Sequence, residues 1–142
     1  MTVFATEGQY ARLSSLLKFI GHPEMPAVHN ELVTVNITGT PTLVIGTVLG
    51  KVTATGKYKV SIETAVDGSQ TPAAIYIGDA FGAANSTTLV SATDTKVLAL
   101  ARGPAIVSKE ALSLDATFDN TTKKDAAYAS LKAVGILVEA SV

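Results

Sequence analysis

The chain has 142 residues, of which 47% are hydrophobic and 16% charged, and its formal net charge is −1. This apolar content excludes a disordered chain, and the absence of any basic cluster argues against nucleic-acid binding. The sequence has no cysteine, no run long enough to span a membrane and no signal peptide, so we expect one cytoplasmic domain without disulfides or thiolate chemistry.

The N-terminal region admits two interpretations. Apolar residues recur at helical spacing ahead of Gly21 and Pro23, which predicts an amphipathic helix over residues 9–19. An extended segment is the alternative. Either conformation leaves an apolar surface that requires a partner, so the region is a candidate for binding another protein.

Three residues of the next stretch are candidate metal ligands: His22, Glu24 and His29. Their spacing fits no standard zinc pattern, and the two prolines between Gly21 and Ala27 favour a turn or an extended connector. We therefore expect a solvated loop without a metal ion.

Strands dominate the middle of the chain. Residues 32–37 alternate as a strand, with Val33 and Val35 on one face. Residues 46–58 predict a β-hairpin that reverses at Thr55-Gly56, because glycine adopts positive φ without steric cost. The return strand alternates between an apolar face and a polar face, the polar one comprising Lys57, Lys59, Ser61 and Glu63.

Residues 67–69 have the composition of a turn, and further apolar runs, which predict strands, follow them. Residues 73–77 predict a strand buried on both faces, and residues 78–86 a surface loop. Further strands are expected at residues 88–91, 96–102 and 105–107, with a break at Gly103-Pro104 and a short helical turn or loop at 108–112.

One helix is expected near the C-terminus. Asp119, Asn120 and Thr121 are candidate N-caps, and Gly135 would end the helix. Its apolar face comprises Ala127, Leu131 and Val134. Residues 136–142 would then form the last strand. The predicted fold class is mainly β (β-rich α+β): a small β-barrel or β-clip-like domain of short antiparallel strands, with one C-terminal helix and an extended N-terminal arm.

No stretch of the sequence matches a known catalytic or phosphate-binding motif completely. The stretch from Gly46 to Val52 is one residue too short for a phosphate-binding loop and lacks the Ser or Thr after its lysine. Ser15 and Lys18 match a serine–lysine pattern without its companion motifs. Asp115 and Asp119 have helical spacing in a sequence typical of a loop. We expect no enzyme activity, no catalytic residue, no cofactor and no small-molecule substrate.

Three motifs carry a family resemblance: Gly46 to Tyr58 (GTVLGKVTATGKY), Asp67 to Thr71 (DGSQT) and Leu100 to Val107 (LARGPAIV). In this order they resemble the lambda-type head decoration proteins, which cement the capsids of tailed bacteriophages. With residues 131–138, the similarity extends from Leu16 to the C-terminus.

The resemblance implies a homotrimer that binds the major capsid protein at threefold and quasi-threefold positions outside the expanded head, stabilising it against DNA pressure. It implies synthesis in the bacterial host cytoplasm and a place on the outer capsid surface. It also implies an N-terminal capsid-contacting arm at residues 1–32, a β-rich decoration domain at residues 33–142, and capsid binding by Leu16, Leu17, Lys18 and Phe19.

The low charged fraction fits this interpretation, because soluble domains carry about 25% charged residues and an interface would cover apolar surface. A small carbohydrate-binding or adhesive module is the alternative. It would require an exposed aromatic platform, whereas aromatic residues make up only 6% of the chain and tryptophan is absent.

Overall fold

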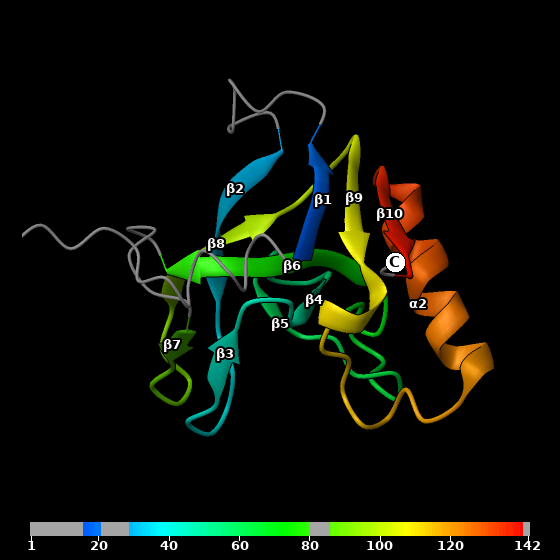
Figure 1. Cartoon of the computed structure of the whole chain (residues 1–142). Helices are drawn as coiled ribbons and strands as arrows, with labels where there is room; N and C mark the ends of the chain where they lie inside the picture. The colour runs from blue at the N-terminus through cyan, green and yellow to red at the C-terminus, as the bar shows by residue number, and fades with distance from the viewer. Residues whose placement is uncertain (1–15, 21–28, 80–85, 141–142) are drawn as a thin grey trace, which may run out of the picture.

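The computed structural model describes residues 16–20, 29–79 and 86–140. Within these ranges the chain is rich in strands and has one α-helix, near the C-terminus, which confirms the expected fold class (Figure 1). The strands are β1 (Leu17–Ile20), β2 (Asn30–Val35), β3 (Thr42–Val44), β4 (Val48–Lys51), β5 (Tyr58–Val60), β6 (Pro72–Asp79), β7 (Ser86–Thr88), β8 (Thr95–Leu100), β9 (Ala105–Ser108) and β10 (Ile136–Glu139). The helices are the 3-10 turn η2 (Lys109–Ala111) and α2 (Thr121–Ala133).

Five strands close into a barrel in the order β2-β5-β4-β6-β8. Alternate side chains of β2 fill its interior: Val33 and Val35 are 3% and 0% exposed, whereas the preceding Leu32, on the outer face, is 50% exposed. The predicted hairpin is confirmed, with Leu49 of β4 opposite Val60 of β5 and a positive φ at Gly56.

The expectation of antiparallel strands is wrong for two pairs, because β2 pairs with β5 and β9 pairs with β10 in parallel. Parallel neighbours require a long crossover connection. The helix α2 belongs to such a crossover between β9 and β10, and a long excursion through β3 and β4 separates β2 from β5.

Strand β6 is almost entirely buried, which confirms the prediction of a strand buried on both faces, and it pairs with β4 on one side and β8 on the other. Its Tyr76 is fully buried, and the Tyr76 hydroxyl lies 2.6 Å from Thr87 Oγ1 in the β3–β7 ribbon. The strand expected at residues 88–91 is wrong in its bounds, because β7 ends at Thr88. The loop expected at residues 78–86 lies largely outside the described residues, since β6 continues to Asp79 and β7 begins at Ser86.

The helix α2 confirms the predicted cap, apolar face and end. The Asn120 side chain accepts a hydrogen bond from the Lys123 backbone N–H at 2.9 Å, Ala127 and Leu131 are buried, and Gly135 follows with φ +88°. The helix packs against β10 and β6. The last strand ends at Glu139, before the predicted end, and residues 141–142 lie outside the described part of the chain.

Candidate functional site

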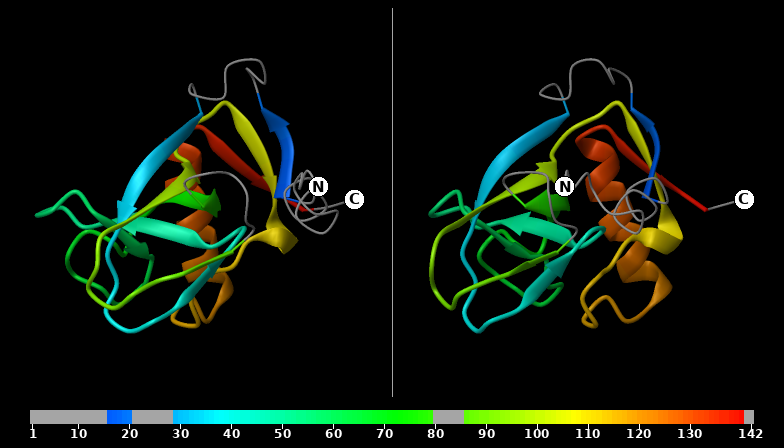
Figure 2. Two further views of the ribbon diagram at one scale, coloured as in Figure 1. Left: turned by 90° about the vertical axis from the view of Figure 1, so that its left-hand side faces the viewer. Right: turned by 60° about the vertical axis from the view of Figure 1, so that its left-hand side comes forward.

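A three-stranded sheet brings the beginning and the end of the described chain together. Its order is β1-β9-β10, with β1 antiparallel and β10 parallel to the central strand β9. These strands lie side by side, and α2 packs against β10 (Figure 2). Local sequence forms each strand, but only the tertiary fold brings residues 17–20 next to residues 105–108.

The four predicted contact residues lie at this sheet. Leu16 is fully buried in the hydrophobic core, and Leu17 is half-buried and packs against that core. Lys18 and Phe19 belong to β1, where the register shifts between Leu17 and Phe19, as a β-bulge does. The predicted helix over residues 9–19 is therefore wrong for residues 17–19, which are extended.

Two glycines of the hairpin motif are required by close backbone contacts. A Cβ at Gly46 would lie 2.1 Å from the Ala111 carbonyl oxygen, and one at Gly50 would lie 2.0 Å from the Ser69 carbonyl oxygen. Beside Gly46, the Ser113 N–H donates to the Gly46 carbonyl at 2.8 Å. Other segments of the chain therefore contact the backbone of this hairpin on two sides. The spacing of the motif alone does not predict these contacts.

The turn at residues 67–71 makes one of these two contacts with the hairpin. The Thr53 N–H donates to the Asp67 carbonyl at 2.9 Å, and the Ser61 hydroxyl donates to the Ser69 carbonyl at 2.8 Å. Ser61 is 1% exposed, so its expected place on a wet face is wrong; the hydrogen bond to Ser69 allows the hydroxyl to be buried. The Asp67 carboxylate accepts a hydrogen bond from the Ser69 N–H at 3.0 Å and pairs with the Lys59 ammonium at 2.6 Å.

We expect the Asp67 carboxylate of this turn to make the stability of the protein depend on pH. Hydrogen bonds from Lys59, and then from Ser69, hold the pKa of Asp67 well below its ordinary value. The stabilisation is therefore present above the pKa of the unfolded carboxyl, about 3.9, and is lost as the pH falls toward the lower folded pKa. Asp67→Asn should lower the melting temperature at pH 7, and its difference from the natural chain should shrink below about pH 4.

Thermal unfolding of both proteins between pH 7 and pH 2.5 measures this difference. Asp125→Asn, which alters an exposed carboxylate of α2, is the control and should change little at either pH. A difference for Asp67→Asn that stays constant down to pH 2.5 would mean that the charge of Asp67 does not stabilise the turn.

The third motif joins the two sheets. The peptide bond between Gly103 and Pro104 is cis, and the Gly103 N–H donates to the Val134 carbonyl at 2.9 Å. A Cβ at Gly103 would lie 1.8 Å from the Gly135 carbonyl oxygen, so these glycines allow the start of β9 to contact the turn between α2 and β10. This contact fixes the register of β10 on β9.

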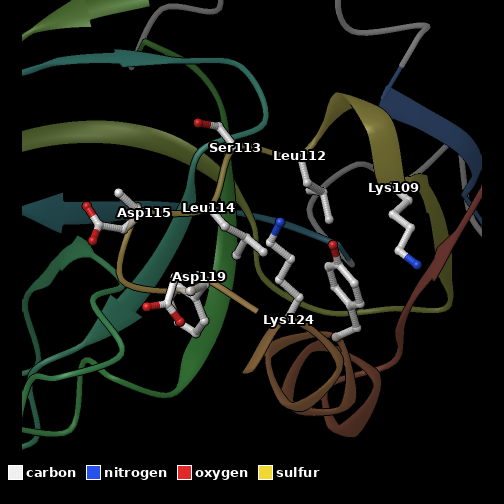
Figure 3. A pocket seen from close by; sticks show the side chains of 10 residues that line it. Lys109, Leu112, Ser113, Leu114, Asp115, Asp119 and Lys124 are labelled. Atoms are coloured by element: carbon white, nitrogen blue, oxygen red, sulfur yellow. The ribbon is translucent and has the colours of Figure 1, made fainter. Parts of the chain in front are cut away.

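A groove of about 540 Å³ lies between residues 109–119 and α2 (Figure 3). Lys109 lies on one side of it, with its Nζ 5.1 Å from the centre of the Tyr128 ring, and burial raises the pKa of the Tyr128 hydroxyl. The candidate carboxylates Asp115 and Asp119 both line the groove. Asp115 accepts hydrogen bonds from the N–H and hydroxyl of Thr117, and Asp119 pairs with Lys123, so local structure engages both carboxylates.

The described part of the chain has no group of three or more side chains that could hold a metal ion. His22 and Glu24 lie outside the described residues. His29 is fully buried, with Nδ1 3.3 Å from the Arg102 carbonyl oxygen, so the expectation of a solvated loop is wrong at this residue. Neither described helix is long and apolar enough to cross a membrane.

The match to a protein family covers residues 16–136, which include all three motifs and the strands β1 to β9. It identifies the class of protein: a structural component of a bacteriophage head, associated with the virion capsid. The matching family is that of the bacteriophage lambda head decoration protein D, and the chain belongs to it. A search of curated proteins gave no match.

Proposed function

We propose that the protein is a homotrimer on the outer surface of the expanded head, at threefold and quasi-threefold positions. There it binds the major capsid protein and stabilises the shell against the pressure of packaged DNA, after synthesis in the host cytoplasm. One observation carries this proposal beyond family membership: β1, formed by the predicted contact segment, is an edge strand of a sheet that the core holds in place.

The burial of residues 16 and 17 indicates what each of them contributes. Leu16 is enclosed in the core, so its role is to anchor the chain, and Leu17 begins β1 while packing partly against the core. The predicted boundary after residue 32 falls inside β2. We therefore assign the capsid-contacting arm to Met1–Ser15, together with β1 at its base.

The arm has the composition of a docking segment. Val3, Phe4, Tyr10 and Leu13 are large apolar residues within fifteen positions, separated by small and polar ones. Such a segment can add main-chain hydrogen bonds to an exposed strand of a partner and insert alternate side chains into its pockets. The apolar arm would thereby bind a capsid subunit without any charged partner surface.

Binding to the assembled shell alone is enough to stabilise it. A ligand present at a hundred times its Kd stabilises the state that it binds by about 2.7 kcal/mol per site. Three arms on one trimer bind with a raised effective concentration once the first has docked. Many individually weak contacts would thus resist the internal pressure.

Expanded heads of the phage that encodes this chain, prepared without it, test the proposal. We expect the purified protein to co-sediment with such heads, with saturation at three copies per threefold site, and to raise the temperature at which the heads rupture. Absence of binding would contradict the function as a whole. Saturation at one copy per site would contradict the trimer alone.

A further inference from the structure

We propose that the groove between residues 109–119 and α2 is a second capsid contact, and that it binds a carboxylate side chain, Asp or Glu, of a capsid subunit. This inference rests on the proposed function and adds a contact of the folded body to that of the arm. The groove would supply a charged contact, which the apolar arm does not offer.

Three hydrogen-bond donors of the groove have no acceptor among the described residues. The Lys109 ammonium lies 5.1 Å from the centre of the Tyr128 ring, and neither Lys109 nor Lys124 forms an ion pair in this part of the chain. The Tyr128 hydroxyl likewise donates to no described group. Because Lys124 and Tyr128 are four residues apart on α2, they lie on the same face of the helix. Two ammonium groups and a hydroxyl, which all donate, suit a carboxylate, which only accepts.

The carboxylates that line the groove are engaged within the chain. Asp115 accepts hydrogen bonds from the backbone and the hydroxyl of a neighbouring threonine, and Asp119 pairs with Lys123 at 3.2 Å. In Figure 3 both carboxylates lie toward one side of the groove and Lys109 toward the other. The charges of Lys109 and Lys124 are therefore the ones that await a partner, and an acidic group is the complementary occupant.

The groove lies next to the place where the arm leaves the folded body. Leu17, the first residue of β1, is paired with Val107 of β9, and η2 begins at Lys109, two residues after Val107. Figure 1 shows η2 at the same end of the sheet as the start of β1. A capsid subunit that holds the arm would therefore lie close to Lys109, so that one subunit can occupy both contacts.

Carbodiimide cross-linking tests the groove, because it joins a lysine amine directly to a carboxylate that touches it. On expanded heads saturated with the protein, we expect Lys109 or Lys124 to be joined to an Asp or Glu of the capsid protein, as mass spectrometry of the digest would identify. The ion pairs of Lys123 with Asp119 and Glu63, 3.2 and 3.5 Å long, should cross-link within the chain and show that the reagent has acted.

The double variant Lys109→Gln/Lys124→Gln measures what the two charges contribute. Both side chains are exposed, so the melting temperature should stay close to that of the natural chain. The variant should bind heads at least about threefold more weakly, and added salt should weaken its binding less than that of the natural chain. Lys132→Gln is the matched control: it removes an exposed lysine of α2 that lies outside the groove, and it should bind like the natural chain.

The outcomes separate this contact from the function as a whole. A double variant that binds like Lys132→Gln, with the same dependence on salt, would overturn the groove contact and leave the proposed function standing. Capsid cross-links that all lie elsewhere on the chain, in a sample where Lys123 is cross-linked, would overturn it as well. A natural chain that fails to bind heads would remove both proposals.

Discussion

Gly46→Ala should lower the free energy of unfolding by about 3 kcal/mol or more, a very large effect for one added methyl group. Gly46 has φ +100°, a conformation that strains any residue with a Cβ. The new Cβ would also lie 2.1 Å from the Ala111 carbonyl oxygen, a backbone atom that cannot rotate away. Relief would require separating the hairpin from residues 111–113. Urea unfolding of the two proteins measures the difference.

Gly39→Ala separates the two causes. Gly39 has nearly the same backbone angle, φ +97°, but a Cβ there would meet only Pro41 Cδ at 4.0 Å. This variant should therefore lose only the conformational contribution, about 1–2 kcal/mol. Equal losses at the two glycines would show that the contact between Gly46 and Ala111 contributes nothing to stability.

Deletion of Met1–Ser15 should abolish head decoration and leave the fold intact. The deletion stops before Leu16, so β1 and the core keep their contacts. If the arm makes the capsid contact, the affinity for heads should fall by more than about tenfold, equivalent to 1.4 kcal/mol. Co-sedimentation with heads gives the affinity, and the melting temperature should stay within a few degrees of that of the full chain.

Deletion of Met1–Ile20 is the comparison that identifies the arm. It also removes β1 and the buried Leu16, and losing one such leucine side chain alone costs about 2–5 kcal/mol. This variant should lose both decoration and stability, whereas the shorter deletion loses decoration alone. Full occupancy of heads by the shorter variant would place the capsid contact within the folded body.

Elements with a local cause could be predicted from the sequence. The helix α2 is specified within sixteen residues by the Asn120 cap, the apolar face at Ala127 and Leu131, and Gly135. The hairpin needs only alternation and a glycine at its turn. Both follow from propensity and periodicity, which act over a few neighbouring residues.

Elements with a distant cause could not be predicted. Helical spacing of Leu13, Leu16 and Leu17 favours a helix, yet pairing with Val107 makes Leu17 part of a strand, because tertiary contacts override propensity. Ser61 looks solvated in its strand and is buried by the Ser69 carbonyl. For the site, the motifs indicated the family, but the sheet that joins β1 to β9 and β10 appears only in three dimensions.

Cryo-electron microscopy of heads with and without the protein tests the central claim most directly, since it shows both where the protein sits and what it touches. We predict added trimeric density at every threefold and quasi-threefold position of the outer surface, with the chain ahead of β1 running onto the capsid subunits. Heads whose surface is identical in the two samples, or density confined to other positions, would contradict it.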